Sequence, residues 1–119
     1  MGISFKIDAE EGIIYAIAEG TIGLEDLLAH RKNVRNDPDF SPSLVQITEF
    51  RMSKFGISDE EGKALASSLP VDLLRKTALV FSAGPNREWA LRYKEWVREK
   101  MPVEVFTDVG SAKKWVTSD

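Results

Sequence analysis

The sequence predicts one α/β domain with a mixed, mostly parallel five-stranded sheet flanked by helices. Three observations lead to this fold class. Apolar and polar residues alternate near the N-terminus, which is typical of half-buried strands. Strand and helix patterns then alternate to the end of the chain, which favours parallel strands joined by crossover helices. The length of 119 residues, with 43% hydrophobic and 29% charged residues, is ordinary for one domain spanning 1–119.

The first two strands form a predicted hairpin. Ile3, Phe5 and Ile7 alternate with polar residues, and a second apolar run occupies residues 13–18. Between them, residues 9–12 have the composition of a tight turn, in which Gly12 can take a positive φ without strain. We therefore expect antiparallel pairing of these two strands.

The remaining elements follow in the order α-β-α-β-α-β-α. From Leu24 the apolar residues fall at helical spacing, and Pro38 limits how far this helix can extend. Ser58 and Glu61 form a capping box that opens a second helix. The other predicted elements are strands at 44–50, 76–82 and 103–108 and helices at 87–100 and 111–116, with the second helix running to about residue 69.

Composition excludes several classes of function. The chain has no cysteine, which rules out disulfides, thiolate metal sites and cysteine nucleophiles. A formal net charge of −3 argues against nucleic acid as the main partner, because phosphate binding needs a concentrated basic surface. No signal peptide and no apolar run near the length of a membrane helix is visible, so we expect a cytoplasmic protein without integral membrane association.

Short stretches over nearly the whole chain match the pattern of a known family. They are residues 3–8, 12–20, 21–27, 37–40, 49–51, 103–108 and 112–116. In these stretches the chain resembles the STAS, or SpoIIAA-like, family of small domains, and more narrowly its uncharacterised STAS/SEC14-like branch. The resemblance implies a SpoIIAA-like fold, and it implies an interaction or regulatory role more weakly because one fold hosts many functions.

The resemblance also draws attention to Ser58. Well-understood members of the family are phosphorylated by anti-sigma kinases at an Asp-Ser-Ser/Thr-Gly stretch at the start of the helix after the third strand. Here residues 55–60 read Phe-Gly-Ile-Ser-Asp-Glu, so the motif is missing and acidic residues follow the serine directly. We expect Ser58 to be a helix N-cap, with a phosphorylation site as the alternative.

No set of residues specifies a reaction. His30 is the only histidine, it lies in the middle of a predicted helix, and it is expected to be exposed or half-buried there. We expect it to form neither a catalytic triad nor a metal site. Arg51, Ser82, Arg87 and Asp108 lie near predicted strand ends but define no catalytic roles. We expect no enzymatic activity, no metal and no cofactor.

Two features remain as candidate ligand or partner sites. The first is the turn from Ser82 through Gly84 and Asn86 to Arg87, which leaves the carboxyl end of an apolar strand, where open α/β sheets usually bind ligands. Its alternative is a plain turn with Asn86 as N-cap. Arg51, at the end of the third strand, is a further candidate.

The second feature is an aromatic stripe on the longest helix. Trp89, Tyr93 and Trp96 recur at i, i+4 and i+7 and therefore lie on one face. Core packing explains part of this stripe. The rest predicts contact with a second subunit or with an apolar ligand, because interfaces are enriched in Trp and Tyr.

Two functions follow from these features. One is a regulatory module without catalytic activity that acts through a protein partner or as a homodimer. The other is a carrier or sensor for a small apolar ligand or lipid, with a pocket lined by Phe50, Met52, Phe55 and Trp89.

Overall fold

The computed structural model describes residues 2–68, 74–81 and 86–118, and the side chains of residues 52, 53, 55 and 86 also lie outside this description. The nine elements have the predicted order β-β-α-β-α-β-α-β-α. Their bounds are β1 Gly2–Asp8, β2 Ile13–Ile22, α1 Leu24–Arg35, β3 Val45–Phe55, α2 Asp59–Ser67, β4 Lys76–Phe81, α3 Asn86–Val97, β5 Val103–Phe106 and α4 Val109–Val116.

The five strands form one sheet in the order β1-β2-β3-β4-β5. β1 pairs antiparallel with β2 through a turn in which Gly12 has φ +73°. The three remaining pairings, β2 with β3, β3 with β4 and β4 with β5, are all parallel. The mixed, mostly parallel sheet predicted from the sequence is therefore confirmed.

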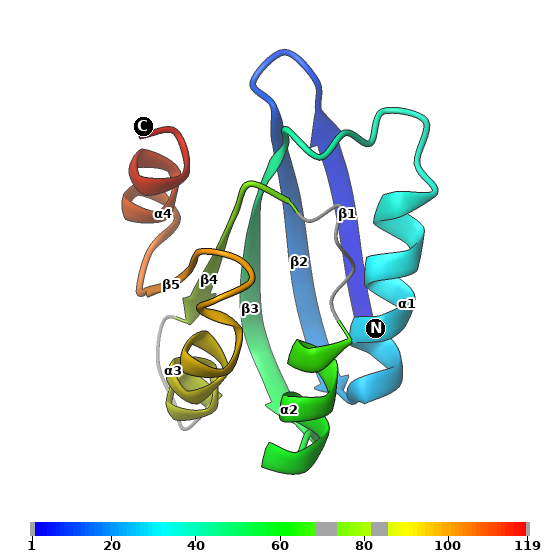
Figure 1. The fold of residues 1–119 in the computed structure, drawn as a ribbon, viewed down its shortest axis with the longest axis vertical. Helices are drawn as coiled ribbons and strands as arrows, with labels where there is room; N and C mark the ends of the chain where they lie inside the picture. Colours follow the sequence, from blue (N-terminus) through cyan, green and yellow to red (C-terminus); the bar gives the residue numbers. More distant parts are fainter. Residues whose placement is uncertain (1, 69–73, 82–85, 119) are drawn as a thin grey trace.

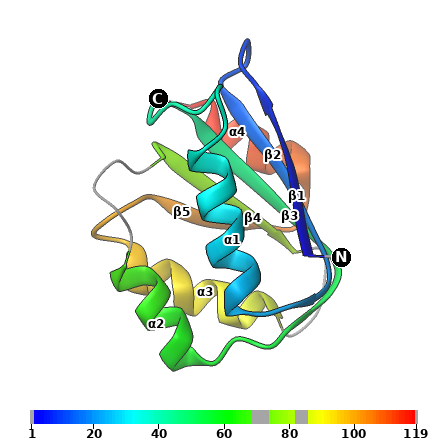
Figure 2. The same ribbon diagram turned by 90° about the vertical axis from the view of Figure 1, so that its right-hand side faces the viewer.

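The helices cover the two faces of the sheet unequally. α1, α2 and α3 lie on one face, and α4 lies on the other, where it packs on β3, β4 and β5 (Figures 1 and 2). Each crossover leads to the next strand in the same direction across the sheet. Since such crossovers are right-handed, their three helices must share one face.

β3 is longer than the sequence indicated. Its pairing with β2 shifts register between Glu19 and Thr21, where Gly20 adopts φ +79°, and then continues to the pair Ile22 and Phe55. Only glycine takes this backbone conformation readily, so Gly20 makes the irregularity possible. The strand predicted from the sequence ended at Phe50, although Met52 continues the alternation of apolar and polar residues past Arg51.

Two of the helices begin at side chains that cap them. The Ser58 hydroxyl accepts a hydrogen bond from the Glu61 amide at 3.1 Å, and the Glu61 carboxylate accepts one from the Ser58 amide at 3.0 Å. Ser58 is thus confirmed as the N-cap of α2. Asp108 caps α4 by accepting from the Ser111 amide at 2.7 Å, which places the start of α4 at Val109, two residues before the predicted start.

The largest cluster of buried side chains lies between the sheet and helices α1, α2 and α3. A smaller one lies beneath α4 and is built on Val45, Ile47, Ala78 and Val80. β4 contributes to both clusters, as its continuous apolar sequence predicted. Within the described ranges, we find no helix of the length and apolar character that crossing a membrane requires.

Candidate functional site: a cavity between the sheet and three helices

A cavity of about 130 Å³ lies in the larger cluster. It forms where α1 packs on β1, α3 packs on β4 and β5, and α2 packs against α1 and α3. The middle of the sheet therefore remains incompletely filled beneath these helices. The cavity is lined by apolar residues Ile3, Leu27, Val34, Phe40, Phe50, Leu65, Leu74, Leu79 and Met101, by Trp89 and Tyr93, and by polar residues His30, Arg31, Arg35, Gln46, Thr48 and Thr77.

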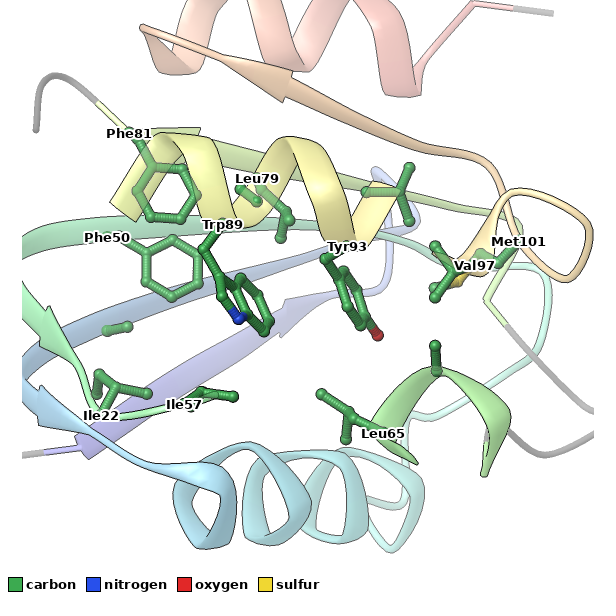
Figure 3. Close-up of a cluster of buried hydrophobic side chains, with 14 residues drawn as sticks. Ile22, Phe50, Ile57, Leu65, Leu79, Phe81, Trp89, Tyr93, Val97 and Met101 are labelled. Carbon is green, nitrogen blue, oxygen red and sulfur yellow. The ribbon is translucent and has the colours of Figure 1, made fainter. Parts of the chain in front are cut away.

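Stacked aromatic rings give the cavity firm walls. Trp89 and Tyr93 project side by side from α3, with ring centroids 5.2 Å apart and planes inclined by 9° (Figure 3). Phe50 of β3 also lines the cavity, and it stacks on Phe81 of β4, which is not a lining residue, with centroids 4.4 Å apart. Aromatic pairs of this kind contribute beyond their area of burial, so they help to fix the three lining rings in place.

Gly62 lets α2 approach the tryptophans of α3. A Cβ at this position would lie 2.5 Å from Cζ3 of Trp96 and 2.9 Å from Cζ2 of Trp89, both closer than van der Waals contact allows. The ring of Trp96 meets that of Trp89 edge to face, with centroids 6.1 Å apart. This packing fixes α2 over the aromatic wall.

His30 is a buried titratable group in the cavity wall, with only 8% of its surface exposed. Its Nε2 donates to Oε1 of Gln46 at 2.9 Å, and its ring meets Phe5 edge to face at 5.6 Å. Its Nδ1 is buried and has no hydrogen-bonding partner among the described residues. Burial lowers the pKa of His30 below 6.5, against the smaller opposing effect of Gln46, so the ring is neutral at pH 7.

Arg31 lies between α1 and the end of α2. Its guanidinium donates to the Leu65 carbonyl at 3.2 Å and to the Ser68 hydroxyl at 3.3 Å, so it satisfies groups at the C-terminus of α2. Burial lowers the pKa of Arg31 from its ordinary value. Burial also raises the pKa of Tyr93, while the nearby Arg31 opposes that rise. Tyr93 is therefore a neutral phenol at pH 7.

This arrangement can hold a small apolar molecule and can offer it a few polar contacts. Most of the lining is hydrocarbon or aromatic, which favours apolar surface by burial. In the part of the chain that the structure describes, no group of three or more His, Asp or Glu side chains is placed to hold a metal ion.

The structure brings together two of the aromatic residues singled out in the sequence. Trp89 and Tyr93 line the cavity. Trp96 is partly buried and does not line it, but its ring contacts the ring of Trp89 edge to face. Phe50 also lines the cavity as predicted. The side chains of Met52 and Phe55, predicted for the same pocket, lie outside the described residues.

The other sequence candidates lie elsewhere. Arg51 is exposed and pairs with Glu49 at 3.0 Å, on the face of the sheet that α4 covers. Arg87 is exposed at the start of α3. Ser82, Gly84 and the side chain of Asn86 lie outside the described residues, so the turn at 82–87 stays a prediction.

The sequence reasoning missed the polar part of the cavity. It placed His30 on an exposed or half-buried helix position, which was wrong because residue 30 faces the sheet together with Leu27 and Val34. The spacing 27, 30, 34 is the helical signal that marks this face. Gln46 and Thr48 alternate with buried Val45 and Ile47, which is the corresponding signal in β3.

Comparison with known proteins supports the fold. No family model matches the sequence, and no curated protein matches it either. Among solved structures, the chain is similar to an uncharacterised DUF3478-family protein from Shewanella loihica PV-4, which has a SpoIIAA-like fold. The two share 18% sequence identity over 96% of this chain and 93% of that one, with a TM-score of 0.63. The predicted SpoIIAA-like fold is thereby confirmed.

Proposed function

We propose that this domain binds a small apolar molecule in the cavity between the sheet and helices α1, α2 and α3, and that it acts by binding rather than by catalysis. The observation that carries the proposal is a cavity of about 130 Å³ with mostly apolar walls. Protein interiors are close-packed and hold few voids larger than a water molecule. A cavity of roughly 150 Å³ with apolar walls is known to accept benzene, so a ligand with one ring or a few carbons matches this volume.

The energetics support the same proposal. Side chains that line an unfilled space have no partner atoms on that side, so they lose the dispersion contacts that a filled core would give them. An apolar ligand that fills the space restores the missing contacts, and its binding free energy then adds to the stability of the folded state.

The burial of Trp89 and Tyr93 weakens the case for the alternative function, a module that binds a protein partner or forms a homodimer. Trp89 and Tyr93 are 6% and 9% exposed, so they contribute little surface to a partner. Among the described residues, the exposed large hydrophobic side chains are Leu28 and Leu91, on α1 and α3 respectively. A partner-binding module or a homodimer stays a prediction, and Trp89 and Tyr93 do not argue for it.

Titration calorimetry with toluene tests the proposal. We expect saturable binding with one site per chain and a negative heat-capacity change, the mark of apolar burial. Thr48→Phe should abolish this binding, because it places a ring inside the cavity from the middle of β3. Leu28→Ala is the matched control, since Leu28 is exposed and does not line this cavity. Equal heats for the wild type and Thr48→Phe would contradict the proposal.

A further inference from the structure

The orphaned Nδ1 of His30 restricts the chemistry of the ligand. It is a buried nitrogen on a side chain that lines the cavity, and no described residue donates to it or accepts from it. The other ring nitrogen is engaged with the carbonyl oxygen of Gln46, which can only accept. In the neutral ring the proton is therefore on Nε2, and Nδ1 keeps a lone pair that no described residue engages.

A buried acceptor without a partner is unfavourable, and a hydrogen-bond donor on the ligand removes this penalty. The charged and titratable side chains around the cavity limit which functional group the ligand can place near Nδ1. Arg31 and Arg35 line the same cavity, so a ligand ammonium group would meet like charge. A carboxylate would direct its own lone pairs at Nδ1 unless His30 gained a proton, which burial opposes. A neutral hydroxyl group meets neither difficulty.

We infer that the ligand is a small neutral molecule of the phenol class, with an apolar ring in the aromatic part of the cavity and a hydroxyl that donates to Nδ1 of His30. The inference rests on the proposed function, because it names the ligand class for the same cavity. It follows from three features that coincide there: a volume suited to about one ring, walls formed by Trp89 and Tyr93, and a buried lone pair at Nδ1.

Phenol and toluene are a matched pair of probes, because both have one ring and only phenol has a hydroxyl donor. His30 is the only histidine of the chain, so the imidazole signals of ¹⁵N-labelled protein need no assignment. We expect phenol to shift the Nδ1 resonance in the direction that accepting a hydrogen bond produces. Toluene should bind while leaving the nitrogen signals nearly unchanged.

Variants add a thermodynamic readout. The ratio of the toluene to the phenol dissociation constant should fall about tenfold in His30→Leu, the value of an ordinary hydrogen bond. Leu28→Ala is the control, because Leu28 is exposed and does not line the cavity. Its ratio should match that of the wild type. If His30→Leu does not fold, the nitrogen shifts of the wild-type protein decide the matter alone.

The outcomes separate the two proposals. Binding of toluene together with an unmoved Nδ1 signal in phenol would overturn the phenol-class inference and leave the apolar cavity site standing. Equal shifts of Nδ1 in phenol and in toluene would overturn the phenol-class inference in the same way. Absence of binding by both probes would overturn the proposed function and this inference together.

Discussion

At the scale of single residues, the buried imidazole of His30 links stability to pH. Its pKa is lowered from 6.5 by burial, and the described residues contribute no charge to that shift. Below pH 6.5 the unfolded chain therefore takes up a proton that the folded chain excludes. The free energy of unfolding is unaffected by this group above pH 7 and falls as the pH is lowered from about 6.5 toward 5.

Urea unfolding at a series of pH values measures this effect. We expect a slope of at most about 1.4 kcal/mol per pH unit in that window, which His30→Leu should remove. The pKa values of Asp8 and Asp108 are lowered from 3.8 by hydrogen bonds to backbone amides, so these carboxylates affect stability only in a more acidic range. An identical slope in the wild type and the variant would contradict the assignment.

Residue-scale features differed in how well the sequence predicted them. The Ser58–Glu61 capping box depends on residues three apart, and the structure shows both of its hydrogen bonds. The environment of His30 depends on Gln46, sixteen residues away, and on which side of the sheet α1 lies. Local sequence patterns therefore predict the capping box, but they do not predict contacts such as that of His30 with Gln46, which join distant residues.

At the scale of elements, the packing of α2 on α3 depends on Gly62. Alanine normally stabilises a helix interior relative to glycine by roughly 1 kcal/mol. Here the added Cβ would collide with the rings of Trp96 and Trp89 at 2.5 and 2.9 Å. We therefore expect Gly62→Ala to destabilise the protein by about 1–3 kcal/mol, the usual cost of overpacking.

Thermal and urea unfolding measure the sign of this change. Gly110→Ala in α4 is the control, because Gly110 is exposed and its added Cβ would approach only an oxygen of the Asp108 side chain, at 3.3 Å. That variant should change the free energy of unfolding by less than Gly62→Ala does, because the exposed Asp108 carboxylate, which caps α4, has to yield by only a few tenths of an ångström. A more stable Gly62→Ala variant would show that α2 does not pack on the aromatic wall as described.

The sequence predicted the elements themselves well, because their signals are local. Alternation in β1, the continuous apolar run of β4 and the helical spacing in α1 each reflect one element and its burial. The end of β3 was missed for the opposite reason. Its last residues are held by β2 after the irregularity at Gly20, and this pairing joins segments that are distant in the sequence.

At the scale of the whole molecule, the sheet order determines where a ligand can bind. Because the parallel strands follow one another in order, all three crossover helices share one face, and α2 packs against its neighbours α1 and α3. The cavity is a consequence of that arrangement. Its aromatic wall was visible in the sequence as the pair Trp89 and Tyr93, but the cavity itself depends on how three helices meet one sheet.

The most direct test of the cavity as the binding site is to locate a bound probe by intermolecular nuclear Overhauser effects. In protein saturated with toluene, we expect contacts from the probe to Trp89, Leu79 and His30, which come from α3, β4 and α1 and meet only at the cavity. Contacts restricted to exposed apolar side chains such as Leu28 and Leu91, or none at all, would contradict binding in the cavity.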